Sequence, residues 1–447
     1  MEQKHAPDGA DKIETARLIN LPHDDVAPGS SRLNHAACTI VSPNYLAYAR
    51  TLAASYLAQH PGQRFFVLIV ADLSDPVPFQ GDAFTPVMLG EIGLRDVRVE
   101  AMKYDILELN TNVKPTFMKY LIERHELDAL AYIDPDIFCY APLDPVFDAL
   151  GSGASAVLTP HITTPIFDGR DPSEQDLLFN GTYNLGFIAV RRCEEGWRLL
   201  TWWEERCLGL GYSEGRTGLF VDQKWMNLAP GLFDGVCILR DAGCNMAYWN
   251  LHERTLAETP EGYTVISPIS GRVPLRFFHF SGIVVGAPEM LSKNTDRFTL
   301  DQRPDLHKLF AGYKAAVLAN KNKAAEALPY GFDSLSDGTT VTRLARRIYS
   351  KHQEHFAGED PFDAKSKFAE FAKAQKLVQG TIAPAKSTWK DFNPRDRRVE
   401  FVHKLLKIVL HVLGPHKYEL LMRYLSYITV LRNQAVFLRD PQWPEGK

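Results

Sequence analysis

Short apolar runs alternate with longer segments of helical periodicity through most of the chain. We predict strands where β-compatible apolar residues follow one another between turn residues, and helices where apolar residues recur three and four positions apart. The predicted strands are 36–41, 65–70, 127–133, 154–158, 185–190 and 275–280, and the predicted helices are 45–59, 113–125, 144–150 and 194–208. This order favours an α/β fold in which helices flank a parallel or mixed sheet.

The pattern changes after about residue 320, where helical spacing dominates. We predict a flexible tail at 1–32, an α/β domain at 33–327 and a mostly helical accessory domain at 328–447, with helices at 341–349, 364–377 and 399–430. Basic residues recur there, and they form either a solvated face or a patch for anionic lipid headgroups or a charged acceptor. These residues are Arg343, Arg346, Arg347, Arg395, Arg397, Arg398, Lys404 and Lys407.

Composition narrows the class of protein. A hydrophobic content of 45% over 447 residues allows a large buried core, and a net charge of −4 gives no electrostatic case for nucleic-acid binding. The six cysteines show no CxxC and no zinc spacing, and four of them lie in apolar stretches, which favours buried free thiols in a reducing compartment over disulfides. Because residues 1–25 lack the apolar core of a secretory signal and no stretch has the length of a membrane span, we expect a cytoplasmic protein, with peripheral contact at the inner membrane surface still open.

Two carboxylates follow the predicted strand 127–133. Asp134 and Asp136 are separated by Pro135, whose ring keeps this link extended. In an open α/β sheet, ligands bind at the carboxyl ends of strands, and two hard oxygen donors there can share a divalent cation that holds a diphosphate. A bare Asp-x-Asp is a weak signal, since a solvated turn has the same sequence.

Other cofactor signatures do not fit. Residues 151–156 match GxGxxA, but they follow a predicted helix and enter a strand, whereas a dinucleotide fingerprint needs the reverse order. The chain has no phosphate-binding P-loop, no HExxH and no GxSxG. Chemistry that combines a metal and a diphosphate is therefore the main enzymatic hypothesis.

Four blocks, taken in order, resemble the GT-A-fold nucleotide-sugar glycosyltransferases, and among them the family 8-like group. The resemblance runs from about residue 36 to about residue 313, and it implies a Rossmann-like mixed sheet flanked by helices, with a helical C-terminal extension. The blocks are Thr39-Ile40-Val41-Ser42-Pro43-Asn44-Tyr45, Asp134-Pro135-Asp136, Phe179-Asn180-Gly181-Thr182-Tyr183-Asn184-Leu185-Gly186-Phe187 with Asp222-Gln223-Lys224-Trp225-Met226-Asn227, and Arg276-Phe277-Phe278-His279-Phe280-Ser281-Gly282.

The resemblance implies a role for each block. Asn44 and Tyr45 would contact uracil, and Tyr45 is alternatively a core aromatic. Asp134, Asp136 and His279 would hold Mn²⁺ or Mg²⁺ against the donor diphosphate, although a histidine among aromatics is often a core residue.

Basic residues would neutralise the diphosphate. Lys114 and Lys119 precede the Asp-Pro-Asp strand and fit this role, unless they are simply exposed. The family's Lys-Pro-Trp is absent after Gly282, so Lys293 or Arg297 would take its place.

The third block would contact the transferred sugar. Asn184 would hold the sugar, Asp222 would bond its hydroxyls and Gln223 would lie near the anomeric carbon. Asp222 also suits a helix N-cap. His161 and the aromatic residues of 245–250 either line the acceptor side or pack in the core.

These residues predict a metal-dependent enzyme that transfers a hexose from a nucleotide-diphosphate sugar to a hydroxyl group of a glycan, a lipid-linked acceptor or a protein. The resemblance implies that the nucleotide is UDP. The resemblance implies retention of anomeric configuration, whereas inversion would require Asp222 as base. A metal-dependent nucleotidyltransferase fits less well, because Ser42-Pro43-Asn44-Tyr45 is not a Gly-rich triphosphate loop. The alternative outside the enzymes is a catalytically silent scaffold that binds a glycan or a nucleotide.

Overall fold

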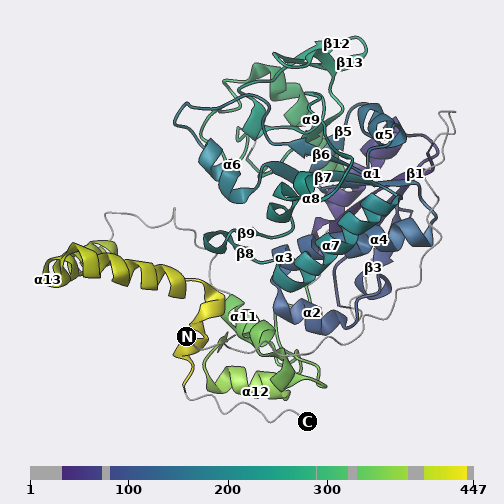
Figure 1. The fold of residues 1–447 in the computed structure, drawn as a ribbon. Helices are drawn as coiled ribbons and strands as arrows, with labels where there is room; N and C mark the ends of the chain where they lie inside the picture. The colour runs from purple at the N-terminus through teal and green to yellow at the C-terminus, as the bar shows by residue number, and fades with distance from the viewer. Residues whose placement is uncertain (1–32, 73–80, 288, 321–329, 381–396, 440–447) are drawn as a thin grey trace.

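A seven-stranded sheet forms the centre of the molecule (Figure 1). The computed structural model describes residues 33–72, 81–287, 289–320, 330–380 and 397–439, so the predicted tail lies outside the described residues. The strand order is β10-β6-β7-β4-β1-β2-β3, and within this sheet β7 runs antiparallel to both neighbours while the other pairs are parallel. The strands are β1 (His35–Val41), β2 (Arg64–Ile69), β3 (Thr85–Met88), β4 (Ala129–Ile133), β6 (Ala156–Pro160), β7 (Tyr183–Arg191) and β10 (Val236–Ile238).

The inner strands are apolar on both faces because each face is covered. Successive side chains of a strand point to opposite faces, so Phe66 and Leu68 of β2 enter one core while Phe65 and Val67 enter the other. Such continuous apolar runs are typical of a sheet enclosed by helices.

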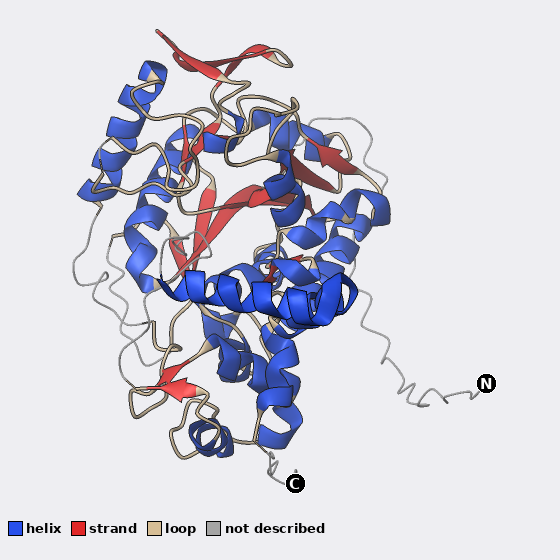
Figure 2. Ribbon diagram, turned by 90° about the vertical axis from the view of Figure 1, so that its left-hand side faces the viewer, coloured by secondary structure: helices blue, strands red, loops and turns tan. Residues whose placement is uncertain are grey.

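Helices lie on both sides of the strands, as Figure 2 shows. One face packs against α2, α3, α4 and α7, and the other face packs against α1 and α5. The helices of this body are α1 (Leu46–Gln59), α2 (Val97–Lys103), α3 (Ile106–Asn112), α4 (Lys114–Arg124), α5 (Asp144–Gly151), α6 (Glu174–Asn180), α7 (Glu194–Leu210), α8 (Ala229–Leu232) and α9 (His307–Ala319).

A second sheet continues from the end of β4. Its strand order is β11-β15-β5, and β5 follows β4 after three residues. A third core fills the space between this sheet and α9. The remaining strands of the body are β5 (Ile137–Cys139), β8 (Ser213–Glu214), β9 (Leu219–Phe220), β11 (Met246–Ala247), β12 (Thr255–Thr259), β13 (Gly262–Ser267), β14 (Gly271–Pro274) and β15 (Phe277–His279).

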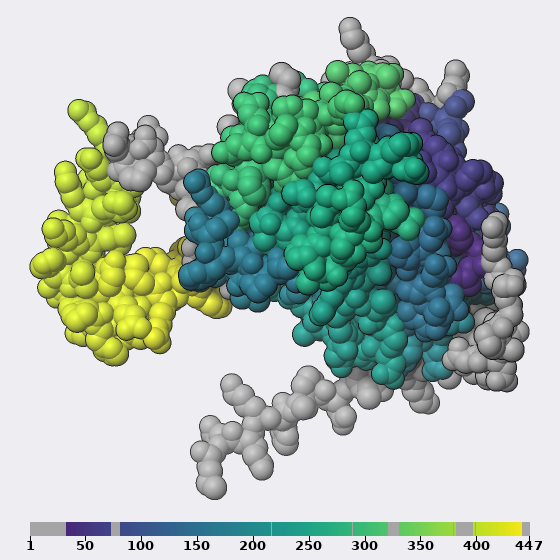
Figure 3. Space-filling model, turned by 90° about the horizontal axis from the view of Figure 1, so that it is seen from above, coloured from purple at the N-terminus to yellow at the C-terminus, as the bar shows by residue number. Residues whose placement is uncertain are grey.

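The C-terminal part divides into a packed portion and a protruding one. Helices α11 (Arg343–Lys351) and α12 (Lys367–Ala374), with the strand pair β16 (Thr340–Val341) and β17 (Val378–Gln379), belong to the same apolar core as α2, α3 and α7. In contrast, α13 (Arg397–Ile428) stands off from the body (Figures 1 and 3). Among the described residues, no helix has both the length and the apolarity needed to cross a membrane.

The prediction of an α/β class is confirmed, with a mixed sheet, flanking helices and a helical C-terminal extension. The domain boundaries stay a prediction. The basic residues of the C-terminal part require a correction, because Arg346 and Arg347 are buried and are not part of an exposed basic face. The long side chains of Arg346 and Arg347 on α11 instead enter the body, where they bond buried acceptors.

Arg347 is the centre of a buried ionic cluster that joins α11 to the body. Its side chain is 0% exposed, as is that of its partner Glu108 on α3, and its Nε lies 2.8 Å from Oε1 of Glu214 on β8. Burial opposes the charged form of Glu108, but Arg347 outweighs it and lowers the pKa of this carboxyl. The residues of this cluster are therefore charged, and each depends on its partners to offset the cost of burying its charge.

We expect Arg347→Met to destabilise the protein by about 3–5 kcal/mol, because it leaves a buried carboxylate without its cation. Urea denaturation measures the change. Arg423→Met is the matched control, since Arg423 forms an exposed pair with Glu419 on α13 and its loss should cost at most about 0.5 kcal/mol. Equal losses of stability from the two substitutions would contradict the assignment of Arg347 to a buried ionic cluster.

Candidate functional site

The link between the two sheets carries the two carboxylates. Asp134 and Asp136 occupy the three-residue segment between β4 and β5. The Asp134 N–H donates to the carbonyl of Gly186 on β7 at 2.7 Å, and the carbonyl of Asp136 accepts from the N–H of Phe280 at 2.9 Å. Both residues are thus held by neighbouring strands, so the link is not a free turn.

His279 at the end of β15 faces both carboxylates. Its Nε2 lies 3.0 Å from Oδ1 of Asp136 and 4.0 Å from Oδ2 of Asp134. One ligand atom from each of the three residues lies within 4.8 Å of the others. The resemblance implies these three residues as one ligand set, and the structure brings them together.

The donor set fits a divalent cation. Mg²⁺ takes ligands about 2.0–2.1 Å away in an octahedron, which puts adjacent ligand atoms roughly 3 Å apart. The Nδ1 of His279 lies 3.1 Å from the amide oxygen of Asn184, which can only accept, so Nδ1 carries the proton. When the ring is neutral, its Nε2 lone pair therefore points toward the carboxylates, as a metal ligand requires.

The charges of this cluster perturb one another. Burial raises the pKa of Asp134, and the nearby Asp136 raises it further, while Lys114 and His279 act in the opposite sense. Burial disfavours charge on His279, but Asp136 and Asp134 outweigh it and raise the pKa of the imidazole. The cluster contains two carboxylates and at most one positively charged imidazole, so its negative charge exceeds its positive charge.

Gly186 leaves room for this arrangement. A Cβ at this position would lie 2.4 Å from Cε1 of His279 and 2.9 Å from Oδ2 of Asp134. Both contacts are far inside van der Waals distance, so any side chain would displace the cluster. Gly186 lies within the third block of the resemblance, but sequence reasoning assigned it no role.

Lys114 and Asp222 form a buried ion pair. The Lys114 Nζ lies 2.5 Å from Oδ2 of Asp222 and donates to the carbonyl of Leu185 at 2.7 Å. It also lies 4.1 Å from the ring centre of Tyr132, whose hydroxyl donates to Oδ1 of Asp134 at 2.7 Å. Burial raises the pKa of Asp222, and Lys114 opposes this shift. The two residues were predicted as separate donor contacts, yet they bind each other beside the carboxylates.

Gln223 and Asn184 are also fixed by hydrogen bonds. The Gln223 side chain accepts from the N–H of Leu185 at 3.0 Å and donates to the carbonyl of Asn180 at 3.1 Å. The Asn184 oxygen accepts from Asn245 at 3.1 Å as well as from His279. Asn184 thus orients the histidine, which is a role that sequence reasoning missed.

Tyr45 presents an exposed ring near the carboxylates. Its side chain is 46% exposed, and its ring stacks on Tyr48 with 5.1 Å between centroids. Burial raises the pKa of Tyr45, and the charge of Asp136 adds to this shift. The adjacent Asn44 is exposed and accepts a hydrogen bond from the Ser42 hydroxyl at 2.7 Å.

Three other predicted cations lie in different surroundings. Lys119 is paired with Glu204 of α7 at 2.6 Å. Arg297 is buried and bonds Asp168 at 2.7 Å. Lys293 is exposed on the loop that follows Gly282, and its N–H donates to the carbonyl of that glycine. Of the three, Lys293 has the exposed side chain that a diphosphate contact needs.

His161 and Trp249 pack behind the site. The Trp249 ring stands edge-on to both His161 and His279, at 5.2 and 5.1 Å between centroids. Burial lowers the pKa of His161 to about 4, so this histidine is neutral. Because Trp249 is 3% exposed, its ring supports the site and offers no open face for a sugar.

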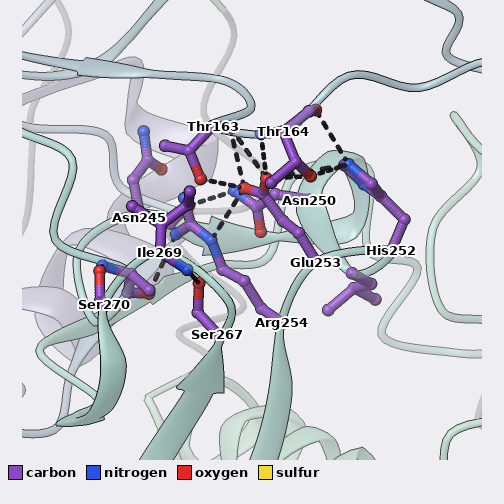
Figure 4. Close-up of polar contacts among 12 residues, drawn as sticks. Thr163, Thr164, Asn245, Asn250, His252, Glu253, Arg254, Ser267, Ile269 and Ser270 are labelled. Carbon is purple, nitrogen blue, oxygen red and sulfur yellow. Dashed lines mark hydrogen bonds and ion pairs between the residues drawn. The ribbon is translucent and has the colours of Figure 1, made fainter.

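A hydrogen-bonded clamp holds the loop that carries Trp249 (Figure 4). The Glu253 carboxylate accepts from the backbone N–H and hydroxyl groups of Thr163 and Thr164, at 3.0 and 2.9 Å for the first of them. The neighbouring Arg254 donates to the carbonyls of Ala242 and Cys244 at 3.0 and 2.8 Å. The loops after β6 and around β11 are therefore tied together.

Comparison with known proteins gives two relatives in Bacillus subtilis strain 168, and no family model matches. The uncharacterized protein YfnF is 31% identical over 200 residues, which cover 44% of this chain and 64% of YfnF. The uncharacterized protein YfnD is 27% identical over 176 residues, which cover 39% and 53%. The chain thus matches less than two thirds of the length of either relative.

Solved structures of glycosyltransferases are among those with a similar arrangement. The galactosyltransferase LgtC, in complex with donor and acceptor sugar analogues, has a TM-score of 0.37 at 17% identity, with 63% of this chain and 95% of LgtC covered. A glycosyltransferase involved in glycosylation of the major capsid of PBCV-1 has a TM-score of 0.31 at 9% identity, with 56% and 94% covered.

We expect Gly186→Ala to destabilise the protein by about 1–3 kcal/mol, because its methyl group would overlap His279. Chemical denaturation provides the measurement. Gly209→Ala in α7 is the control, since a Cβ there meets no atom within 4 Å and should stabilise the helix by up to about 1 kcal/mol. If both substitutions are stabilising, the close approach at Gly186 is absent in solution.

Proposed function

We propose that this protein is a glycosyltransferase that depends on a divalent cation, Mn²⁺ or Mg²⁺, and transfers a hexose from a UDP-sugar to a hydroxyl acceptor. The observation that carries the proposal is the convergence of Asp134, Asp136 and His279, with ligand atoms within 4.8 Å. Two carboxylate oxygens and one imidazole nitrogen are a donor set that Mn²⁺ accepts. The bound cation would supply charge neutralisation for the departing diphosphate.

The surrounding residues would hold the donor. The exposed ring of Tyr45 would stack on the uracil base, and Asn44 would bond its edge. Lys293 would contact the diphosphate from the loop after Gly282. Gln223 and Asn184 would face the sugar, both preorganised by the hydrogen bonds that fix them, so little ordering would be needed when the donor binds.

We propose that the transfer retains the anomeric configuration. An inverting enzyme needs a carboxylate that is free to take the proton of the acceptor hydroxyl. Asp222 was the candidate, but its 2.5 Å ion pair with Lys114 engages it and both side chains are buried. This pair supports a role in positioning Lys114 and the sugar rather than in proton transfer.

A nucleotidyltransferase is less well supported. Such an enzyme cradles a triphosphate on backbone N–H groups of a flexible Gly-rich loop after the first strand. Here β1 is followed by the short 3-10 turn Pro43–Tyr45, which begins with proline and contains no glycine. The turnover experiment below distinguishes a glycosyltransferase from a catalytically silent nucleotide-binding scaffold.

We expect UDP to bind in the presence of Mn²⁺ and to bind at least about tenfold more weakly after Asp136→Asn or His279→Ala, because each variant removes a ligand. Isothermal titration calorimetry measures both affinities. His355→Ala is the control, since His352, Glu354 and His355 are a second histidine-containing cluster in the C-terminal part. Loss of binding in the control alone would move the metal site to that cluster.

We expect donor hydrolysis with Mn²⁺ to identify the sugar, and NMR of the product to show the anomer of the donor. Chelation with EDTA should abolish turnover. An inverted product would refute retention and return Asp222 to the role of base, while intact metal and UDP binding without turnover of any donor would favour the scaffold.

A further inference from the structure

Helix α13 exposes an unusual number of large apolar side chains. Val412 is 76% exposed and Phe401 is 67% exposed, although a helix of a folded protein normally buries such residues. Val436 and Phe437, in the 3-10 segment η9 (Leu431–Phe437) that follows, are exposed as well. Figure 3 shows α13 standing away from the body, whereas η9 contacts α11 and packs Ala435 against the apolar core.

The exposed apolar residues are arranged in stripes. Gly414, with φ of 72°, and Pro415 divide α13 into two straight parts. In the first part, Phe401, Leu405, Ile408 and Val412 follow at spacings of four, three and four residues, which places them on one side of the helix. In the second part, Leu420, Tyr424 and Tyr427 follow at spacings of four and three. Each part is therefore amphipathic.

Basic side chains border both stripes. Lys404, Lys407 and His411 form the neighbouring side of the first part, and all three are exposed. In the second part, Lys417 lies three residues before Leu420, and Arg423 directly precedes Tyr424. Apolar and aromatic residues beside a row of cations are the composition of helices that lie in the headgroup region of a membrane.

The charge of α13 is opposite to that of the rest of the chain. The helix has six basic and two acidic residues, a net charge of +4, whereas the full chain has −4, so the remainder carries −8. Two α13 helices that paired through their apolar stripes would bring like charges together, but an anionic lipid surface would attract the helix and repel the body.

The attachment of the helix is fixed at its C-terminal end. Arg432 of η9 forms a 2.8 Å ion pair with Glu214, which in turn binds Arg347 of α11. The η9 segment is therefore tied to the body, and α13 extends from this attached end.

We propose that α13 and η9 form a peripheral membrane anchor that lies in the interface of a bilayer containing anionic phospholipid. The apolar stripes would be buried among the acyl chains, and the lysine and arginine side chains would extend to the headgroups. This inference does not depend on the glycosyltransferase proposal, because it concerns residues outside the candidate site.

The full-length protein should float with extruded vesicles of phosphatidylcholine that contain about 30 mol% phosphatidylglycerol, and should bind pure phosphatidylcholine at least about tenfold more weakly. Raising the salt concentration from about 0.1 to about 0.5 M should weaken the binding, since screening shortens the reach of the charges. No nucleotide or metal is needed, so failure of this experiment is separate from failure of the proposed function.

The double variant Ile408→Gln/Val412→Gln should reduce vesicle binding about tenfold or more without unfolding the protein, because both side chains are exposed. Leu107→Gln on α3 and Leu318→Gln on α9 are matched controls that change similarly exposed apolar residues of the body and should bind as wild type. Light scattering gives the oligomeric state in parallel. Equal binding of variant and wild type, absence of vesicle binding, or a dimer that the double variant dissolves would each overturn the proposal.

Discussion

The geometry of the candidate site depends on how two sheets are joined. A link of three residues leads from the seven-stranded sheet into the small sheet, so Asp134 and Asp136 cannot move independently of either. The N–H of Asp134 is held by β7, and the carbonyl of Asp136 is held by the residue that follows β15. Because His279 ends β15, the same strand pairing that closes the small sheet brings the histidine to the carboxylates.

The antiparallel course of β7 completes this arrangement. A parallel strand beside β4 would present its carboxyl end at this edge, whereas β7 presents its beginning, with Asn184 and Gly186. Asn184 orients the histidine, and the missing side chain of Gly186 leaves space for the ring. The direction of β7 thus determines both the tautomer of His279, through Asn184, and the space for its ring, through Gly186.

Much of this arrangement could be predicted from the sequence. The strands and helices predicted between 36 and 208 coincide closely with observed elements, because their apolar patterns are long and bounded by Gly, Pro or charged residues. The shorter elements β3, α2, α3, β5 and α6 were not predicted. The grouping of Asp134, Asp136 and His279 was also expected, but from resemblance of ordered motifs. Hydrophobic periodicity alone carries no information about contacts across 140 residues of chain, roughly the separation of the two ends of the cluster.

Pairings between distant polar residues were not predictable. Lys114 and Asp222 each looked like a substrate contact, since a sequence does not reveal that two charged residues will be buried against each other. The same difficulty applied to Lys119 with Glu204 and to Arg346 and Arg347, which were counted as surface charges. Asn245 gave no signal, because its contact with Asn184 depends on the loop around β11.

The pairing of Glu108 with Arg347 has a consequence for synthesis of the chain. The two residues are 239 positions apart, so the carboxylate leaves the ribosome long before its cation does. Until α11 has been made, Glu108 lacks the cation that lowers its pKa, although the N–H of Ser213 can already bond its carboxylate. The buried ion pair that joins α11 to the body can therefore form only late in synthesis, and the packing around Glu108 is completed by a carboxyl-terminal segment.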